Sequence, residues 1–372
     1  MAHRRKTLTG SQSSRTYAPV SGFILRLARQ SAAMTQEKLA EFLGVDVNTI
    51  QGWESGRRPL SAVGAGDFIR LCGQLCRAGA PASTGRHLRE AIEADQVLAT
   101  GITAADSWVD PDSHPLAASV HRWTITNLIL WPILGKKPQH LQLFVPRVAR
   151  RGPTPEHPSL SAEERARFLD HLLTVVERAD LSTDALLRRQ AVYLLGFDGR
   201  AEAANWLRAE WQRARRRRPR EGNITELLEA RSASVAMAVA GDSSSLRDFA
   251  HHMTGQIGEV ANLNYWAYWI GELGDEQTTD DFMVDADTRA WAGVRMLHHL
   301  LRRVDPESPQ LPLNLSTLHT LVASRPSLLS GQHAARDSLT EVLDRLASCD
   351  ALARSQRDQL AGLQYAVRAA DR

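Results

Sequence analysis

Residues Phe23 to Pro59 contain a dense set of helix-start and helix-stop signals, and they constrain the fold of this chain most. Their sequence is FILRLARQSAAMTQEKLAEFLGVDVNTIQGWESGRRP. Thr35 and Asp46 are residue types that cap helix N-termini. Gly44 lies between them and can adopt the left-handed conformation that ends a helix. These signals predict a first helix followed by two short helices joined by a tight turn, the second of which ends at Gly56.

The second short helix has two distinct faces. Ile50 and Trp53 are one turn apart and are expected to point inward. The outward positions carry small or amide side chains instead of a row of charges: Val47, Asn48, Gln51 and Gly52. Two short helices joined in this way form a helix-turn-helix, whose second helix fits the major groove of DNA.

The stretch TQEKLAEFLGVDVNTIQGWESGRR resembles the Cro and lambda-repressor class of DNA-binding domains, also called the xenobiotic-response-element class. These domains occur in bacterial transcriptional regulators, and the resemblance covers roughly a fifth of the chain. The whole chain, rich in Arg and Ala, also looks like actinobacterial regulators of this class. The implied partner is double-stranded DNA with an inverted-repeat operator, bound by a homodimer.

The resemblance assigns DNA contacts to eight residues: Gln36, Val47, Asn48, Thr49, Gln51, Gly52, Arg57 and Arg58. Gln36 would hydrogen-bond a phosphate, whereas Val47, Asn48 and Gly52 lie where family members touch base edges. Asn48 is the strongest candidate, because an amide can pair bidentately with adenine. Gly52 departs from the polar side chain that the family usually has at this position.

The resemblance also implies a structural ion pair between Arg29 and Glu54. In several family members the matching residues form a buried pair that locks the first helix to the third. Removal of either partner alone would leave an uncompensated buried charge.

Charge is unevenly distributed along the chain. A net charge of +3 does not by itself imply nucleic-acid binding, but residues 1–60 hold nine Lys or Arg against four acidic residues. This local excess suits a phosphate-binding domain. Residues 1–20 are basic and rich in Ser and Thr, and we expect a disordered arm. The arm is either a frayed terminus or a segment that brings Arg4, Arg5 and Lys6 to DNA.

Helical periodicity and turn residues predict an all-α protein. We expect a five-helix DNA-binding domain over 21–78, a linker over 79–85, and short helices with a Pro-rich connection over 86–158. Residues 159–372 are expected to form an all-helical array for dimerisation and effector binding. No fixed repeat period holds, so a tetratricopeptide-like solenoid and an irregular helical domain both stay open.

A run of aromatic residues is the candidate effector or dimer contact in the C-terminal region: Tyr265, Trp266, Tyr268 and Trp269. Such runs more often belong to a core. The implied effector would be a small molecule or a peptide. A nearby segment rich in Asp and Glu, between Glu272 and Asp287, is expected to be a solvated surface loop.

Several functional classes find no support in the sequence. The three cysteines have no metal-binding spacing. There is no phosphate-cradling glycine loop, G-x-S-x-G motif or zincin pair, so we expect no enzyme, metal or cofactor. The apolar run Leu128 to Leu134 is too short to span a membrane, and a cytoplasmic, nucleoid-associated protein is expected.

The function most consistent with the sequence is a sequence-specific transcriptional regulator that acts as a dimer, with the C-terminal helices dimerising and sensing a signal. The alternative is an interaction protein, such as an adaptor or an antitoxin, whose DNA-binding head serves mainly for autoregulation.

Overall fold

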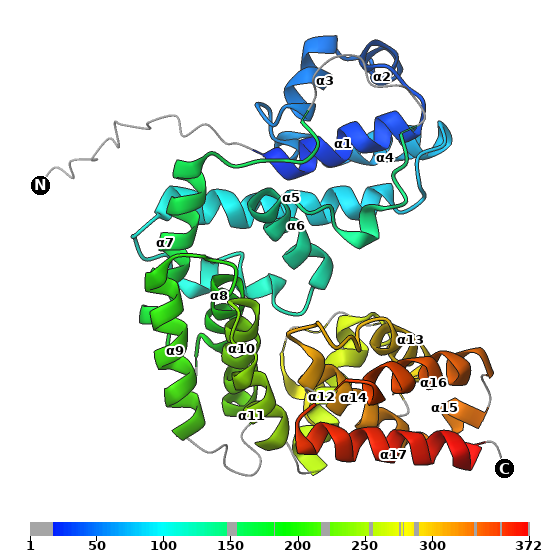
Figure 1. Cartoon of the computed structure of the whole chain (residues 1–372). Coiled ribbons are helices and arrows are strands. Elements are labelled where there is room, and N and C mark those ends of the chain that lie inside the picture. The colour runs from blue at the N-terminus through cyan, green and yellow to red at the C-terminus, as the bar shows by residue number, and fades with distance from the viewer. Residues whose placement is uncertain are drawn as a thin grey trace, which may run out of the picture. The chain divides into compact units, whose positions relative to one another are not determined.

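The computed structural model describes residues 18–370, except 147–154, 182, 217–223, 253–255, 275–276, 278, 286–289, 331–332 and 350–351. The expected basic arm therefore lies, apart from residues 18–20, outside the described residues. Within the described ranges the regular structure consists of 17 α-helices and five short 3₁₀ helices, with no strand (Figure 1). The all-α prediction is confirmed.

The chain divides into two compact units. The first comprises residues 1–109, 113–115 and 124–171, and the second comprises 110–112, 116–123 and 172–372. This division differs from the sequence-based scheme. Within the expected linker at 79–85, residues 79–83 form the connection between two helices of the first unit, and residues 84–85 begin the second of these helices.

The first unit begins with four α-helices and one 3₁₀ helix: α1 (Pro19–Ser31), α2 (Gln36–Leu43), α3 (Val47–Glu54), η1 (Leu60–Ala62) and α4 (Ala65–Arg77). Its other elements are α5 (Thr84–Ala104), α6 (Trp123–Leu134), η4 (Gln139–Leu141) and the start of α7 (Ala162–Arg178). The long helix α5 packs along α1 (Figure 1). α6 contains Pro132 and continues through it for two residues.

Tight packing joins α1 to α3. A side chain at Gly22 would overlap the backbone carbonyl of Trp53, so glycine permits this close approach. Ile24, Leu39 and Ile50 are fully buried in the small core. Ile69 on α4 is 71% exposed. The helix turns its Leu71 and Leu75 inward, and the angular offset of 100° per residue leaves Ile69 on the outside.

The N-terminus of α1 is capped from another helix. Ala18 precedes α1 and offers no side-chain cap. Instead, the carboxylate of Asp95 on α5 accepts hydrogen bonds from the backbone N–H groups of Val20 and Ser21, both at 2.9 Å. Burial raises the pKa of Asp95 to about 7, against the opposing effect of its bonds to Ser21 and Val20. Asp95 thus ties the first helix to α5.

Replacement of Asp95 by alanine is expected to lower the free energy of unfolding by about 2 kcal/mol, because two buried N–H groups would lose their acceptor. Denaturant unfolding of the full chain measures the change. Gln96→Ala, at an exposed position of the same helix, is the control and should change little. Equal stability of the two variants would contradict the capping role.

The second unit is built from the remaining helices: α8 (Ala185–Leu195), α9 (Ala201–Arg216), α10 (Ile224–Val239), α11 (Ser244–His252), α12 (Gln256–Trp269), η5 (Asp281–Val284), α13 (Val294–Leu301), α14 (Leu311–Ser324), α15 (Ser327–Ser330), α16 (His333–Ala347) and α17 (Arg354–Ala370). The short elements η2 (Pro111–Ser113) and η3 (Ala117–Ser119) precede α6 in the chain, and η3 packs on α8. α10 packs on both α8 and α9, and α14 packs on α17 (Figure 1). None of the described helices has the length and apolar character needed to cross a membrane.

Two buried ion-pair clusters lie in the second unit. Arg188 contacts Glu229 at 2.5 Å and Glu210 at 3.0 Å, joining α8 to α10 and α9. Arg189 binds both carboxylate oxygens of Asp280 at 2.8 Å. Although burial acts against ionisation, the hydrogen bond from Arg189 keeps the pKa of Asp280 well below its usual range. Asp280 is therefore a structural residue, and the expectation of a solvated acidic loop is wrong at this position.

Candidate nucleic-acid interface

The turn between α2 and α3 is defined by side-chain caps and one glycine. The hydroxyl of Thr35 accepts a hydrogen bond from the N–H of Lys38 at 3.2 Å, and Asp46 accepts from the N–H of Asn48 at 2.7 Å. Gly44 has φ +68°, which strains residues with a side chain. Each cap satisfies a backbone donor at the start of its helix. Both short helices therefore begin where the sequence predicts.

α3 presents one face to solvent. Ile50 is fully buried and Trp53 is half-buried. The side chains of Asn48 and Gln51 are exposed, and those of Val47 and Thr49 are half-buried. An amide-rich, largely uncharged surface is therefore available on this helix for contacts with base edges.

A buried ion pair between α1 and α3 lies on the core side of this surface. Arg29 on α1 donates from Nε and Nη2 to the two oxygens of Glu54 on α3, at 2.5 and 2.9 Å. Its Nη1 donates to the carbonyl of Met34 at 2.8 Å. This bidentate pair links α1 to the end of α3 and helps to hold the two helices in a fixed orientation.

Gln36 takes part in the same cluster. Its side-chain amide donates to Oε2 of Glu54 at 2.7 Å. Since an amide nitrogen carries two hydrogens, this bond occupies one donor of Gln36. The residue expected to touch a phosphate thus also joins the start of α2 to α3.

Arg58 lies across Gly52. A Cβ atom added at Gly52 would meet Cδ and Cγ of Arg58 at 3.0 and 3.1 Å. The guanidinium of Arg58 donates from Nη1 to the hydroxyl of Thr49 at 2.9 Å. The arginine stem therefore occupies the space that a side chain at position 52 would fill. Gly52, expected to face outward, is instead buried beneath this stem. Arg57 is exposed and donates to Ser55 at 3.4 Å.

A protein-family model described as "Helix-turn-helix" matches residues 25–62. Residues 25–62 are a helix-turn-helix of the Cro and lambda-repressor class. No curated protein and no solved structure matches the chain. The helix-turn-helix supports a DNA-binding, transcription-regulatory role. It includes all eight residues to which the sequence assigns DNA contacts, and both members of the Arg29–Glu54 pair.

The aromatic residues of α12 lie outside the helix-turn-helix and fall into two groups. Trp266 and Tyr268 are buried. Tyr265 and Trp269 are half-buried and stack at 5.7 Å, and the guanidinium of Arg231 lies 4.0 Å from the Tyr265 ring. A cavity of about 20 Å³ beside them has room for about one water molecule.

Proposed function

We propose that the chain is a sequence-specific transcriptional regulator that binds double-stranded DNA as a dimer and inserts α3 into the major groove. The observation that carries this proposal is the exposed amide-bearing face of α3, held from behind by the Arg29–Glu54 pair. A dimer would place two such helices about 34 Å apart on an inverted repeat. Such a protein would act in the cytoplasm, in contact with the nucleoid.

We assign the base contacts to three side chains. The exposed amide of Asn48 reads an adenine, and the methyl groups of Val47 contact a thymine methyl. Arg58 reads a guanine, replacing the polar contact that Gly52 lacks. Its guanidinium is directed along α3 by the bond to Thr49, so it is partly oriented before DNA binds. Gln51 completes this base-facing surface.

The phosphate contacts are assigned to the edges of the same surface. Gln36 would use its second amide hydrogen, because the first is donated to Glu54. Arg57 follows α3 and is exposed. Contacts of this kind position the domain without reading sequence.

The second unit is proposed to dimerise and to sense a small molecule or peptide. Tyr265 and Trp269, rather than the buried Trp266 and Tyr268, are the aromatic side chains that an effector would meet. The adjoining cavity is too small for such a ligand, so binding would require the pocket to open.

Replacement of Asn48 by alanine is expected to cost about 1–3 kcal/mol of binding free energy at one operator base, with little change in non-specific affinity. Competition binding with operators altered at single positions measures this. Arg208→Ala, at an exposed position of the second unit, is the control. A uniform loss on all duplexes would contradict base reading by Asn48.

Replacement of Arg58 by alanine is expected to relax the preference for guanine at one position by about 1–3 kcal/mol. A phosphate contact would instead weaken binding equally on all sequences and reduce the salt dependence by about one counterion. Affinities for four single-base operator variants, measured at two salt concentrations, separate these outcomes. A change in salt dependence without a change in base preference would show that Arg58 contacts a phosphate and does not read a base.

A further inference from the structure

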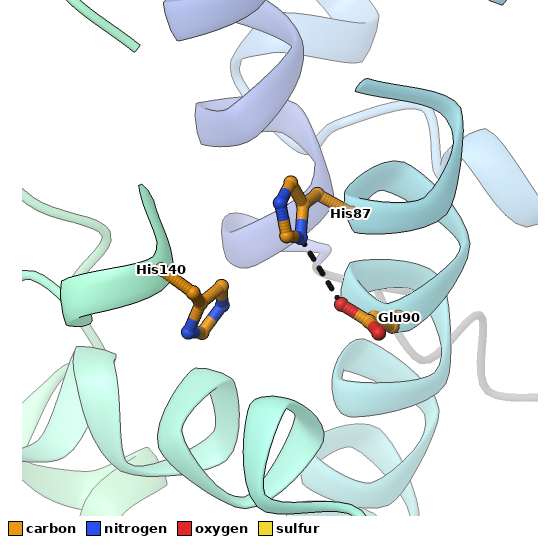
Figure 2. A group of neighbouring side chains, drawn as sticks. All are labelled: His87, Glu90 and His140. Atoms are coloured by element: carbon orange, nitrogen blue, oxygen red, sulfur yellow. Dashed lines mark hydrogen bonds and ion pairs between the residues drawn. The ribbon is translucent and has the colours of Figure 1, made fainter. Parts of the chain in front are cut away.

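A cluster of two histidines and a carboxylate lies in the first unit, outside the helix-turn-helix match. His87 and Glu90 are on α5, and His140 is in η4. One possible ligand atom from each residue lies within 4.8 Å of those of the other two. Figure 2 shows His140 facing the other two side chains from its separate segment. Among the described residues this is the group of three whose donor atoms approach closely enough to hold a metal ion.

We propose that His87, Glu90 and His140 form a binding site for a divalent transition-metal ion such as Zn²⁺. Two imidazoles and one carboxylate are a donor set that Zn²⁺ takes in proteins, with the fourth position left for water or another ligand. This inference concerns metal binding alone and does not depend on the DNA-binding proposal.

The spacing on α5 fits this chemistry. His87 and Glu90 are three residues apart, so they share one face of the helix. Nδ1 of His87 lies 3.1 Å from Oε2 of Glu90, the interaction drawn dashed in Figure 2. With metal–ligand bonds of about 2.0–2.2 Å, tetrahedral ligand atoms are roughly 3.3–3.6 Å apart. The metal would replace the hydrogen bond between these two residues with little movement.

The third ligand comes from a segment that packing holds in place. Leu141 and Phe144 are almost fully buried on either side of the turn that follows His140. The ring of Phe144 also contacts His87, with centroids 5.8 Å apart. The rings of His87 and His140 are 5.1 Å apart, and both ring nitrogens of His140 are buried. The ligand atoms lie within 4.8 Å of one another, so a displacement of the His140 donor by roughly 1 Å would bring the three to the spacing of tetrahedral ligands.

Burial distinguishes this cluster from surface histidines. His87 is 1% exposed and Glu90 is 7% exposed. Thr124 hydrogen-bonds Glu90, which helps to orient the carboxylate, as outer-shell partners of metal ligands do. The guanidinium of Arg86 is 4.0 Å from the other carboxylate oxygen. Its charge acts against cation binding, but its side chain is 61% exposed and can move into solvent.

The test is titration of the full chain, freed of metal by a chelator, with Zn²⁺ in a calorimeter and with Co²⁺ followed by visible absorption. The expected result is one high-affinity ion per chain and a Co²⁺ spectrum of nitrogen and oxygen ligands. His140→Ala and Glu90→Gln should each lower the affinity at least about 100-fold, since loss of an outer-shell partner alone costs 10- to 100-fold.

His298→Ala is the matched control, because His298 is exposed on α13 and should not contribute. Circular dichroism identifies a variant that fails to fold, and the conservative Glu90→Gln then carries the comparison. The proposal is overturned if that chain binds no stoichiometric Zn²⁺. It is equally overturned if folded His140→Ala and Glu90→Gln bind Zn²⁺ as tightly as the His298→Ala control.

Discussion

Replacement of Glu54 by alanine is expected to destabilise the helix-turn-helix by about 3–5 kcal/mol. The substitution leaves the Arg29 guanidinium buried and, within the part of the chain that the structure describes, hydrogen-bonded to the carbonyl of Met34 alone. It also removes the acceptor of the Gln36 amide. An unpaired buried charge costs more than the pair contributes. Thermal melting of the full chain and hydrogen exchange of peptides from α1 to α3 measure the effect.

Two controls isolate the ion pair in this experiment. Glu41→Ala removes an exposed carboxylate from α2 and should leave exchange unchanged. The double variant Arg29→Met, Glu54→Leu removes both charges and should recover part of the loss. Exchange in Glu54→Ala that matches Glu41→Ala would show that the pair does not secure α3.

Replacement of Arg188 by methionine is expected to cost about 3–5 kcal/mol in the second unit. Arg188 is the cation shared by Glu210 and Glu229, which are 3% and 6% exposed. Its loss removes the ion-pair partner of Glu229, whereas Glu210 keeps the contact with Arg213 at 2.7 Å. Denaturant unfolding followed by hydrogen exchange in α8 to α10 measures the loss. Arg208→Met, at an exposed position on α9, is the control.

This loss should depend on pH in a defined direction. Burial already raises the pKa of Glu229. Without Arg188 the carboxyl of Glu229 would hold its proton more tightly in the folded state than in the unfolded state, so stability falls as pH rises. The deficit of Arg188→Met should therefore shrink as pH is lowered from 8 toward 5. A deficit that is constant over this range would show that the carboxyl of Glu229 is not the cause.

Local signals were sufficient for the helix-turn-helix. Thr35, Gly44 and Asp46 act through hydrogen bonds and backbone conformations within a few residues, so their roles can be read from the chain. Helical periodicity was likewise sufficient for the all-α class. The roles of Val47, Asn48 and the other DNA contacts stay predictions, because DNA binding itself is what tests them.

Contacts between distant residues could not be predicted in the same way. Asp95 caps α1 from 75 positions along the chain. The sequence predicted that Asp280 is solvated, but in the fold it is paired with Arg189. His87 and Glu90 are three residues apart on one helix, but their companion His140 comes from a separate segment interrupted by prolines. Each of these depends on how helices pack, which periodicity leaves open.

The most direct test of the central claim is selection of binding sites from a randomised duplex library with the full-length chain at near-physiological salt, where binding through phosphates alone is weak. We expect enrichment of an inverted repeat whose half-sites are about one helical turn apart, centre to centre. Asn48→Ala should lose selection at one symmetric position of that repeat. If the duplexes bound by the unaltered chain share no motif, base reading by α3 is contradicted. That result would favour a role that depends on protein partners.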